Sequence, residues 1–303
     1  MSSPQDYREP LDAARLTEEL PSFNGPWTAI EIVPQTGSTN TDLLEWAARG
    51  LPEGVVLVAE EQTAGRGRMG RSWVSPPGAA LTFSVLLRPE ALPPARRPWL
   101  PLVAGIGTVT SIRMLTGLEA ELKWPNDVLI GGRKVAGILA EAAGNAIVVG
   151  IGVNVSTTLE ELTPGPGGLP PTSLLAEGVP VHRDLLLIEI LRSLGQWYKT
   201  MAAEPDPQRI GLLAQYHKLS ATVGRGVRVE LPGGQSISGL ATGIDADGQL
   251  LVEADGGMYQ IAAGDVIHVR LAATGGRTVL YGDFGRRAVA PCPHEQGSDA
   301  GAG

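Results

Sequence analysis

The sequence EEQTAGRGRMGRSWVSPPG, residues 60–78, decides between two fold classes. Gly65, Gly67 and Gly70 have the spacing of a dinucleotide-binding fingerprint, which requires a helix that begins at the glycines and directs its N-terminus at a pyrophosphate. Two prolines follow within the same stretch, and residues 80–87 then alternate apolar and small side chains, as a strand does. The stretch is therefore interpreted as a glycine-rich loop and not as the start of a Rossmann helix.

The segments around this loop predict an α+β domain. Short apolar runs and alternating patterns predict strands over residues 54–59, 80–87, 121–124, 134–141 and 147–154. Amphipathic or capped patterns predict helices over residues 39–49, 98–115, 183–201 and 208–219. Gly131 and Gly132 are expected to form a hairpin turn between two of the strands. This order of elements favours a largely antiparallel sheet flanked by helices.

The pattern changes from Gly224 onward. Five short strands are expected over residues 227–231, 236–244, 249–253, 258–262 and 266–270, with Gly-Gly and Asp-Gly turns between them. So many short strands in succession predict a small barrel. Apolar periodicity fades after Arg270, and residues 272–303 are expected to be a disordered tail.

The composition limits the possible classes of protein. The chain has 303 residues, 43% of them hydrophobic, and its net charge of −8 argues against general affinity for nucleic acids. A single cysteine, Cys292, and four scattered histidines exclude a disulfide framework and a cysteine-based zinc site. The longest uncharged stretch, residues 142–159, is too polar and too interrupted by glycines to span a membrane, and the N-terminus has no apolar segment typical of a secretory signal. We expect a soluble, cytoplasmic protein of about two domains.

Three arginines are interleaved with the glycines of residues 60–78. Arg66, Arg68 and Arg71 offer planar guanidinium groups that bind carboxylates or phosphates through two hydrogen bonds. Trp73 adds a flat surface on which an adenine can stack. The spacing alone fits equally well a solvated basic loop beside a core tryptophan.

Two further stretches carry polar groups among apolar ones. In KWPNDVLIGGRKVAG, residues 123–137, Asn126 and Asp127 follow Pro125, so they form either an ordinary turn, which composition favours, or a pair of oxygen ligands for Mg²⁺. Lys134 is unusual among small apolar residues of a strand unless it faces a site. In GIGVN, residues 150–154, two strand glycines allow a ligand close to the backbone, or mark a bulge.

These stretches together resemble the biotin protein ligases, most of all the single-function actinobacterial members. The resemblance rests on residues 37–40 (GSTN), residues 62–73 (QTAGRGRMGRSW), residues 123–127 (KWPND), residues 134–139 (KVAGIL) and residues 152–154 (GVN), in family order and spacing. It covers about residues 27–270. It implies a class II synthetase-like catalytic domain over residues 27–220 after an N-terminal extension, residues 1–26, and an SH3-like barrel over residues 221–271.

The resemblance also implies an activity and roles for individual residues. The family forms biotinyl-5′-AMP from biotin and ATP with Mg²⁺, then transfers biotin to a lysine of a biotin carboxyl carrier domain. The expected catalytic residues are Lys134, Arg66 and Arg68. The expected biotin-binding residues are Ser38, Thr39, Asn40, Gln62, Gly65, Arg66, Gly67, Arg68, Lys134, Gly137 and Gly152. The expected nucleotide-binding residues are Arg68, Arg71, Trp73, Asn126, Asp127, Lys134 and Asn154, and Asn126 and Asp127 are the candidate metal ligands.

The expected partners are the carrier domains of acyl-CoA and pyruvate carboxylases, with no DNA and no membrane. About 30 residues with several prolines precede the motifs, too few for the winged helix with which some family members repress transcription. Two alternatives remain: a lipoate–protein ligase, which shares the fold and the adenylation chemistry, and a ligand-sensing repressor or adaptor. The ligand that drives pyrophosphate exchange with ATP distinguishes them.

Overall fold

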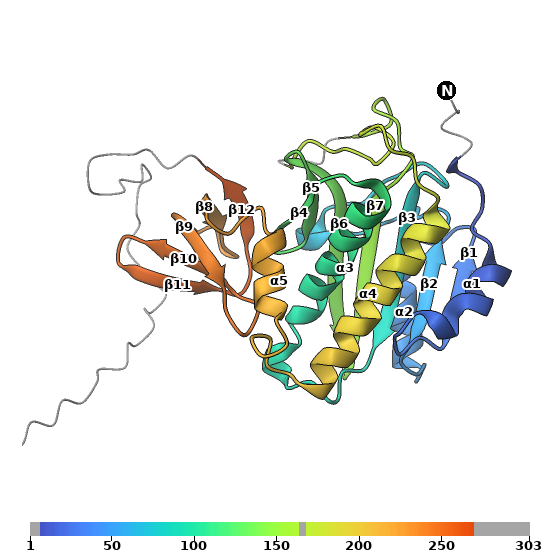
Figure 1. Ribbon diagram of the computed structural model, residues 1–303, viewed down its shortest axis with the longest axis horizontal. Helices are drawn as coiled ribbons and strands as arrows, with labels where there is room; N and C mark the ends of the chain where they lie inside the picture. Colours follow the sequence, from blue (N-terminus) through green and yellow to red (C-terminus); the bar gives the residue numbers. More distant parts are fainter. Residues whose placement is uncertain (1–6, 164–167, 270–303) are drawn as a thin grey trace, which may run out of the picture. The chain divides into compact units, whose positions relative to one another are not determined.

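The computed structural model describes residues 7–163 and 168–269 (Figure 1). The chain divides into two compact units. The first comprises Met1–Ala221 with Ala246–Gly248, and the second Thr222–Asp245 with Gln249–Gly303. The expected tail, residues 272–303, lies outside the described residues.

A seven-stranded sheet forms the centre of the first unit, in the order β1-β2-β3-β7-β6-β5-β4. Only β1 and β2 are parallel, and every other neighbouring pair is antiparallel. The strands are β1 (Ala29–Val33), β2 (Val55–Ala59), β3 (Ala80–Leu87), β4 (Ala120–Lys123), β5 (Asp127–Ile130), β6 (Arg133–Ala143) and β7 (Ala146–Asn154). Strands β2 and β3 are buried along their whole length, and β2 accordingly reads as a continuous apolar run.

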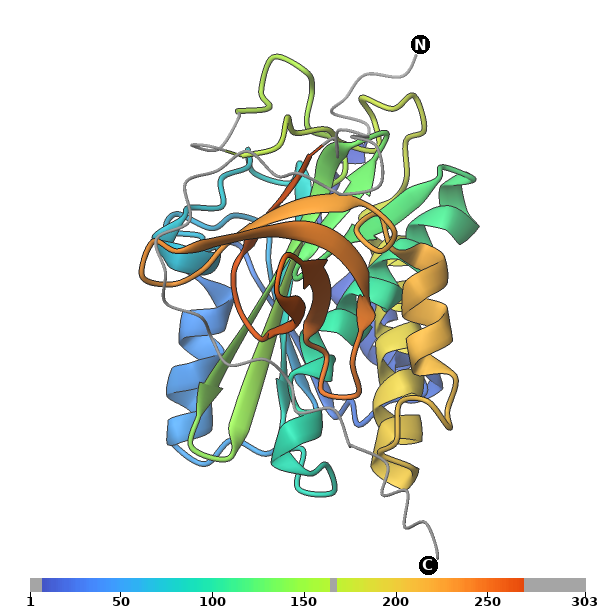
Figure 2. The ribbon, with the colours of Figure 1, turned by 90° about the vertical axis from the view of Figure 1, so that its left-hand side faces the viewer.

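Helices cover both faces of this sheet (Figure 2). The helix α2 (Thr39–Ala48) packs on one face through Leu43 and Ala47, against Leu57 and Val148. On the other face lie α3 (Trp99–Thr116) and α4 (Arg183–Ala203), with α1 (Ala13–Glu19) and α5 (Leu212–Leu219) beside them. Short 3-10 helices occupy Leu20–Ser22, Arg68–Gly70 and Pro94–Arg96. The sheet is thereby the middle layer of three.

The most apolar helix of the molecule is α3. By length and composition the run Pro94–Thr116 could cross a membrane, but most of it is buried against β6 and α4. At Gly107 the helix packs closely on α4, because even an added Cβ would lie in van der Waals contact with the Ile190 oxygen, at 3.5 Å. The helix ends at Gly117, whose φ of 71° forms a left-handed cap. These contacts are those of a core helix.

The second unit is an antiparallel sheet of five short strands in the order β11-β10-β9-β8-β12. They are β8 (Gly226–Glu230), β9 (Ser236–Ile244), β10 (Leu250–Ala254), β11 (Gly257–Ile261) and β12 (Asp265–His268). Val227, Val229 and Val252 lie in its apolar core. These are the five strands of the expected barrel, and over the described residues β11 and β12 form the two ends of the strand order.

The α+β class and the mainly antiparallel sheet are confirmed, with the hairpin turn at Gly131 and Gly132. Two expectations need correction. Asp127 begins strand β5 instead of lying in a turn, because residues 127–130 pair on both sides with β4 and β6. The last helix of the first unit begins at Leu212 and not at residue 208. The expected extension, residues 1–26, contains helix α1.

Candidate active site

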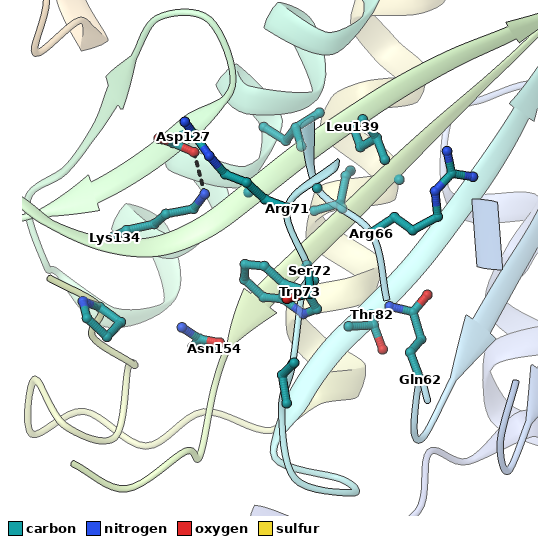
Figure 3. Close-up of a pocket in the computed structure, with 18 of the residues that line it drawn as sticks. Gln62, Arg66, Arg71, Ser72, Trp73, Thr82, Asp127, Lys134, Leu139 and Asn154 are labelled. Atoms are coloured by element: carbon teal, nitrogen blue, oxygen red, sulfur yellow. Dashed lines mark ion pairs between the residues drawn. The ribbon is translucent and has the colours of Figure 1, made fainter. Parts of the chain in front are cut away.

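A cavity of about 390 Å³ lies over β6 and β7, within the usual size range of small-molecule sites (Figure 3). Its lining comes from the start of α2, from the loop between β2 and β3, from β5, β6 and β7, and from the segment that follows β7. The arginine-rich loop of residues 60–78 therefore contributes to the cavity wall.

Two glycines form the floor of this cavity. Gly137 of β6 and Gly152 of β7 are directly paired, and the indole of Trp73 lies against both of them. A Cβ added to Gly152 would lie 2.6 Å from Cε2 of Trp73, and one added to Gly137 would lie 3.4 Å from its Cζ3. The Nε1 atom of Trp73 is buried and has no hydrogen-bond partner among the described residues. The floor thus carries an indole N–H donor that no described residue accepts from.

The arginine-rich loop folds back on itself as a tight hairpin. The amide of Trp73 donates to the Gly65 oxygen at 2.9 Å, and that of Gly67 donates to the Arg71 oxygen at 2.7 Å. At the tip, Met69 and Gly70 take positive φ values of 56° and 73°. No α-helix begins at these glycines, which agrees with the rejection of a dinucleotide fingerprint. The hairpin instead carries its cationic side chains along the cavity.

A hydrogen-bonded network lies at the α2 end of the cavity. Gln62 Oε1 accepts from the Thr39 amide at 2.9 Å and from its hydroxyl at 3.1 Å. The Thr39 hydroxyl also lies 2.7 Å from Ser84 Oγ, which donates to Asn40 Oδ1 at 2.6 Å. Thr39, Asn40 and Ser84 are buried. Hydroxyl and amide groups make up this network.

Glu141 connects that network to the arginine-rich loop. Its Oε2 accepts from Asn40 Nδ2 at 2.9 Å, and its Oε1 pairs with Arg66 at 2.8 Å. Arg66 also donates to the Thr41 hydroxyl at 3.3 Å. The guanidinium of Arg66 is therefore held by a carboxylate of β6, on the opposite side of the indole from Lys134 (Figure 3).

The other end of the cavity is cationic. Lys134 Nζ lies 2.6 Å from Asp127 Oδ1, and Lys123 Nζ lies 3.9 Å from Oδ2 of the same carboxylate. Arg68 donates to Asn126 Oδ1 at 3.3 Å. Four cationic side chains line the whole cavity, Arg66, Arg68, Arg71 and Lys134, against two carboxylates, Asp127 and Glu161. In an acidic protein this local excess of positive charge suits an anionic ligand.

The segment after β7 closes the remaining side. Asn154 Nδ2 donates to the Thr172 oxygen at 2.9 Å, and backbone bonds join Lys134 to Pro170 and Thr172 at 2.8 Å each. Asn154 is thus tied to this wall through its amide nitrogen.

The expected site residues converge on this one cavity, with one exception. Those that line it are Ser38, Thr39, Asn40, Gln62, Arg66, Gly67, Arg68, Arg71, Trp73, Asn126, Asp127, Lys134, Gly137, Gly152 and Asn154. Gly65 does not line it; its missing side chain instead leaves room for the backbone of Trp73. Their individual roles, and metal binding by Asn126 and Asp127, stay predictions.

Sequence reasoning missed other residues of the site. Thr82 lines the cavity from β3, and Thr157, Glu161 and Thr163 line it from the segment after β7. Thr82 could have been found, because a polar threonine within an apolar run is visible in the sequence. The other three carry no such signal.

Comparisons with known proteins place this geometry in a family. Residues 32–157 match the Biotin/lipoate A/B protein ligase family, and residues 222–269 match the Biotin protein ligase C terminal domain. The chain is 42% identical over 279 residues to the biotin–[acetyl-CoA-carboxylase] ligase of Mycobacterium tuberculosis, covering 89% of this chain and all of that one. It is 34% identical over 257 residues to the bifunctional ligase/repressor BirA of Escherichia coli, covering 82% and 76%.

A solved structure with ligands has the same fold. The biotin protein ligase from Aquifex aeolicus in complex with biotin and ATP matches with a TM-score of 0.65 and 28% identity, over 80% of this chain and 98% of that one. The sequence identity, the two family matches and the shared fold all point to the same family. The chain belongs to the biotin protein ligase family.

Proposed function

We propose that this chain joins biotin to ATP in the cavity over β6 and β7 and passes the biotin to a carrier protein. In the first step a biotin carboxylate oxygen attacks the α-phosphorus of ATP, the bond to the β-phosphate oxygen breaks, and pyrophosphate leaves. In the second step a lysine amine attacks the acyl carbon of biotinyl-5′-AMP, and AMP leaves. The single observation that carries the proposal is a cavity with a network of hydroxyl and amide groups at one end and a cluster of cationic side chains at the other.

We assign the biotin ring to the polar end. Thr39, Asn40 and Gln62 offer hydroxyl and amide groups there, and their mutual hydrogen bonds hold them in place before a ligand arrives. A urea-like ring needs both donors and acceptors, which amides and hydroxyls supply and charged groups do not. The glycine floor then leads from this end toward Lys134.

We assign the nucleotide to the cationic end. A carboxylate and a triphosphate repel each other, and Arg68, Arg71 and Lys134 supply charge to bring them together. Trp73 offers an apolar face and an unpaired indole N–H. The hairpin of residues 65–73 covers the floor, so it would exclude water from the mixed anhydride between the two steps.

The oxygen atoms of Asn126 and Asp127 fit Mg²⁺ only if the ion binds together with ATP. Over the described residues no group of three or more His, Cys, Asp or Glu side chains could hold a metal ion. Asp127 supplies one carboxylate, shared with two lysines, and Asn126 one amide oxygen. Mg²⁺ commonly binds through one or two carboxylates together with substrate phosphates, so we assign it to the MgATP substrate. When bound, it would add positive charge at the phosphates.

The second substrate is proposed to be the biotin carboxyl carrier domain of acyl-CoA or pyruvate carboxylases. The Mycobacterium tuberculosis relative is named for acetyl-CoA carboxylase, which supports this class of partner. We propose a cytoplasmic enzyme that binds neither membranes nor DNA directly. The catalytic part is proposed as residues 27–220 and the SH3-like part as residues 221–271.

One experiment tests both steps. The chain is incubated with an apo carrier domain, MgATP and either biotin, lipoate or octanoate, and pyrophosphate exchange and the mass of the carrier are measured. We expect exchange with biotin alone and a carrier mass increase equal to one biotinyl group. Exchange driven by lipoate or octanoate instead would assign the cavity to a lipoate ligase, and binding of biotin without exchange would favour a sensor.

A further inference from the structure

Arg8, upstream of the family motifs, reaches the segment that follows β7. Its Nη1 donates to Glu161 Oε1 at 3.1 Å, and its Nη2 contacts Glu161 Oε2 at 2.5 Å and the Ser156 oxygen at 3.0 Å. The Arg8 side chain is only 9% exposed. One guanidinium therefore joins two points of the segment that lie five residues apart. Such a forked contact fixes direction as well as distance.

The segment that Arg8 holds is a wall of the cavity. Thr157, Glu161 and Thr163 line the cavity, and the segment leaves β7 directly after Asn154. Ser156 is also held by the Ala79 oxygen at 2.8 Å. In contrast, residues 158–163 make, within the described part of the chain, no hydrogen bond to a distant residue except those of Arg8.

The base from which Arg8 extends is itself fixed. The Leu11 amide donates to Glu60 Oε1 at 2.9 Å, and Arg183 donates to the Glu9 oxygen at 2.7 Å. Arg183 also pairs with Glu60 at 2.6 Å and has a side chain only 2% exposed. These bonds tie residues 9–11 to the end of β2 and the start of α4. The backbone next to Arg8 is therefore fixed to the end of β2 and the start of α4, and the Arg8 side chain extends from there to the cavity wall.

We propose that Arg8 is a positioning residue for the nucleotide side of the active site. It holds residues 156–163 as a wall and compensates the Glu161 carboxylate, which would otherwise repel an anionic nucleotide. Without Arg8, the wall must be ordered when ATP binds, at a cost in conformational entropy. The inference rests on the proposed function for the placement of the nucleotide beside Asn154.

The test measures the kinetic constants of the full-length chain and of Arg8→Ala in biotin-dependent pyrophosphate exchange. We expect the KM for ATP to rise about tenfold, while the KM for biotin and kcat stay within about twofold. Arg8→Lys is expected to restore part of the ATP affinity, because it keeps the charge but not the fork. A general loss of structure would instead change both KM values and kcat together.

The matched control is Arg15→Ala. Arg15 belongs to the same N-terminal segment and pairs with Glu19 at 2.8 Å on the exposed side of α1, away from the lining residues. It is expected to behave as wild type. If Arg8→Ala does not fold, as judged by circular dichroism, Glu161→Gln is measured in its place. It is expected to raise the KM for ATP more than twofold but less than tenfold, because the ion pair that holds the wall is lost while the carboxylate that would repel the nucleotide is lost with it.

Two kinds of result would count against these proposals, and they can be told apart. An ATP KM within twofold of wild type, or equal changes in both KM values, overturns the role of Arg8. A wild-type chain without biotin-dependent exchange would instead overturn the proposed function, so the two failures are distinct.

Discussion

Replacing Lys134 by alanine is expected to slow the formation of biotinyl-5′-AMP by about 10²-fold or more. The ammonium lies in the cavity wall, 2.6 Å from Asp127, with 30% of its side chain exposed. A unit charge about 4 Å from a developing charge contributes roughly 4 kcal/mol at the effective dielectric of a protein surface. Partial exposure to solvent reduces this value to about 3 kcal/mol. At 1.36 kcal/mol per factor of ten, that is a little over 10²-fold in rate.

The fold is expected to survive this change. After the substitution, Asp127 still has Lys123 at 3.9 Å, so its carboxylate is not left alone. The rate is measured as single-turnover formation of biotinyl-5′-AMP from labelled ATP, and biotin affinity is measured separately. Because the charge on the α-phosphate grows in the transition state, biotin binding is expected to weaken less than the rate.

A second variant separates catalysis from simple pairing. If Lys134 serves only to neutralise Asp127, then Lys134→Ala combined with Asp127→Asn restores the wild-type rate. If Lys134 acts on the reacting groups, the double variant stays about 10²-fold slow, in line with the loss of a transition-state donor. A single-turnover rate of Lys134→Ala within about threefold of wild type would refute the reasoning altogether.

Three further outcomes follow from the geometry. Gly152→Ala places a new Cβ against the Trp73 indole. It is expected to raise the KM values for biotin and ATP by about tenfold or more and to lower the free energy of unfolding by about 1–3 kcal/mol. Unchanged kinetic constants would contradict this contact. Ser84→Ala is expected to lower the free energy of unfolding by about 1–3 kcal/mol, since Asn40 and Thr39 lose a buried partner, and urea denaturation measures it. The hydrogen bond from Arg8 lowers the pKa of Glu161, so its stabilising effect is present above the ordinary glutamate pKa of about 4.3 and is lost as the pH falls through the lower, folded value. The stability difference between wild type and Arg8→Ala is therefore expected to shrink in acid, and a difference that does not change with pH would argue against this ion pair.

Local patterns were sufficient for most of the fold. Strand β3 and strand β9 have the boundaries that alternation and turn glycines predict, and the buried helix α3 differs by one residue at each end. Strand β5 was missed because Asn126 and Asp127 have the composition of a turn, whereas its pairing with β4 and β6 comes from distant parts of the chain. Propensity describes a residue's neighbours in sequence and not those in space.

The same limit applies to the active site. The cationic side chains were recognisable because their type is unusual in a glycine-rich loop or a small apolar strand. Glu141 and Glu161 carried no signal, since acidic residues near strand ends are ordinary in an acidic chain. Their partners, Arg66 and Arg8, are 75 and 153 residues away, so only the fold brings these pairs together.

The paired glycines under the Trp73 indole bear on drug resistance. An inhibitor that rested on this floor would contact Gly137 and Gly152, and every possible mutation at those positions adds atoms to an occupied space. A resistant variant that blocked the inhibitor there would also displace the indole on which the enzyme's own substrates are proposed to depend. Compounds anchored to the backbone of β6 and β7 would thus leave a pathogen fewer routes of escape than compounds anchored to the side chains at the cavity rim.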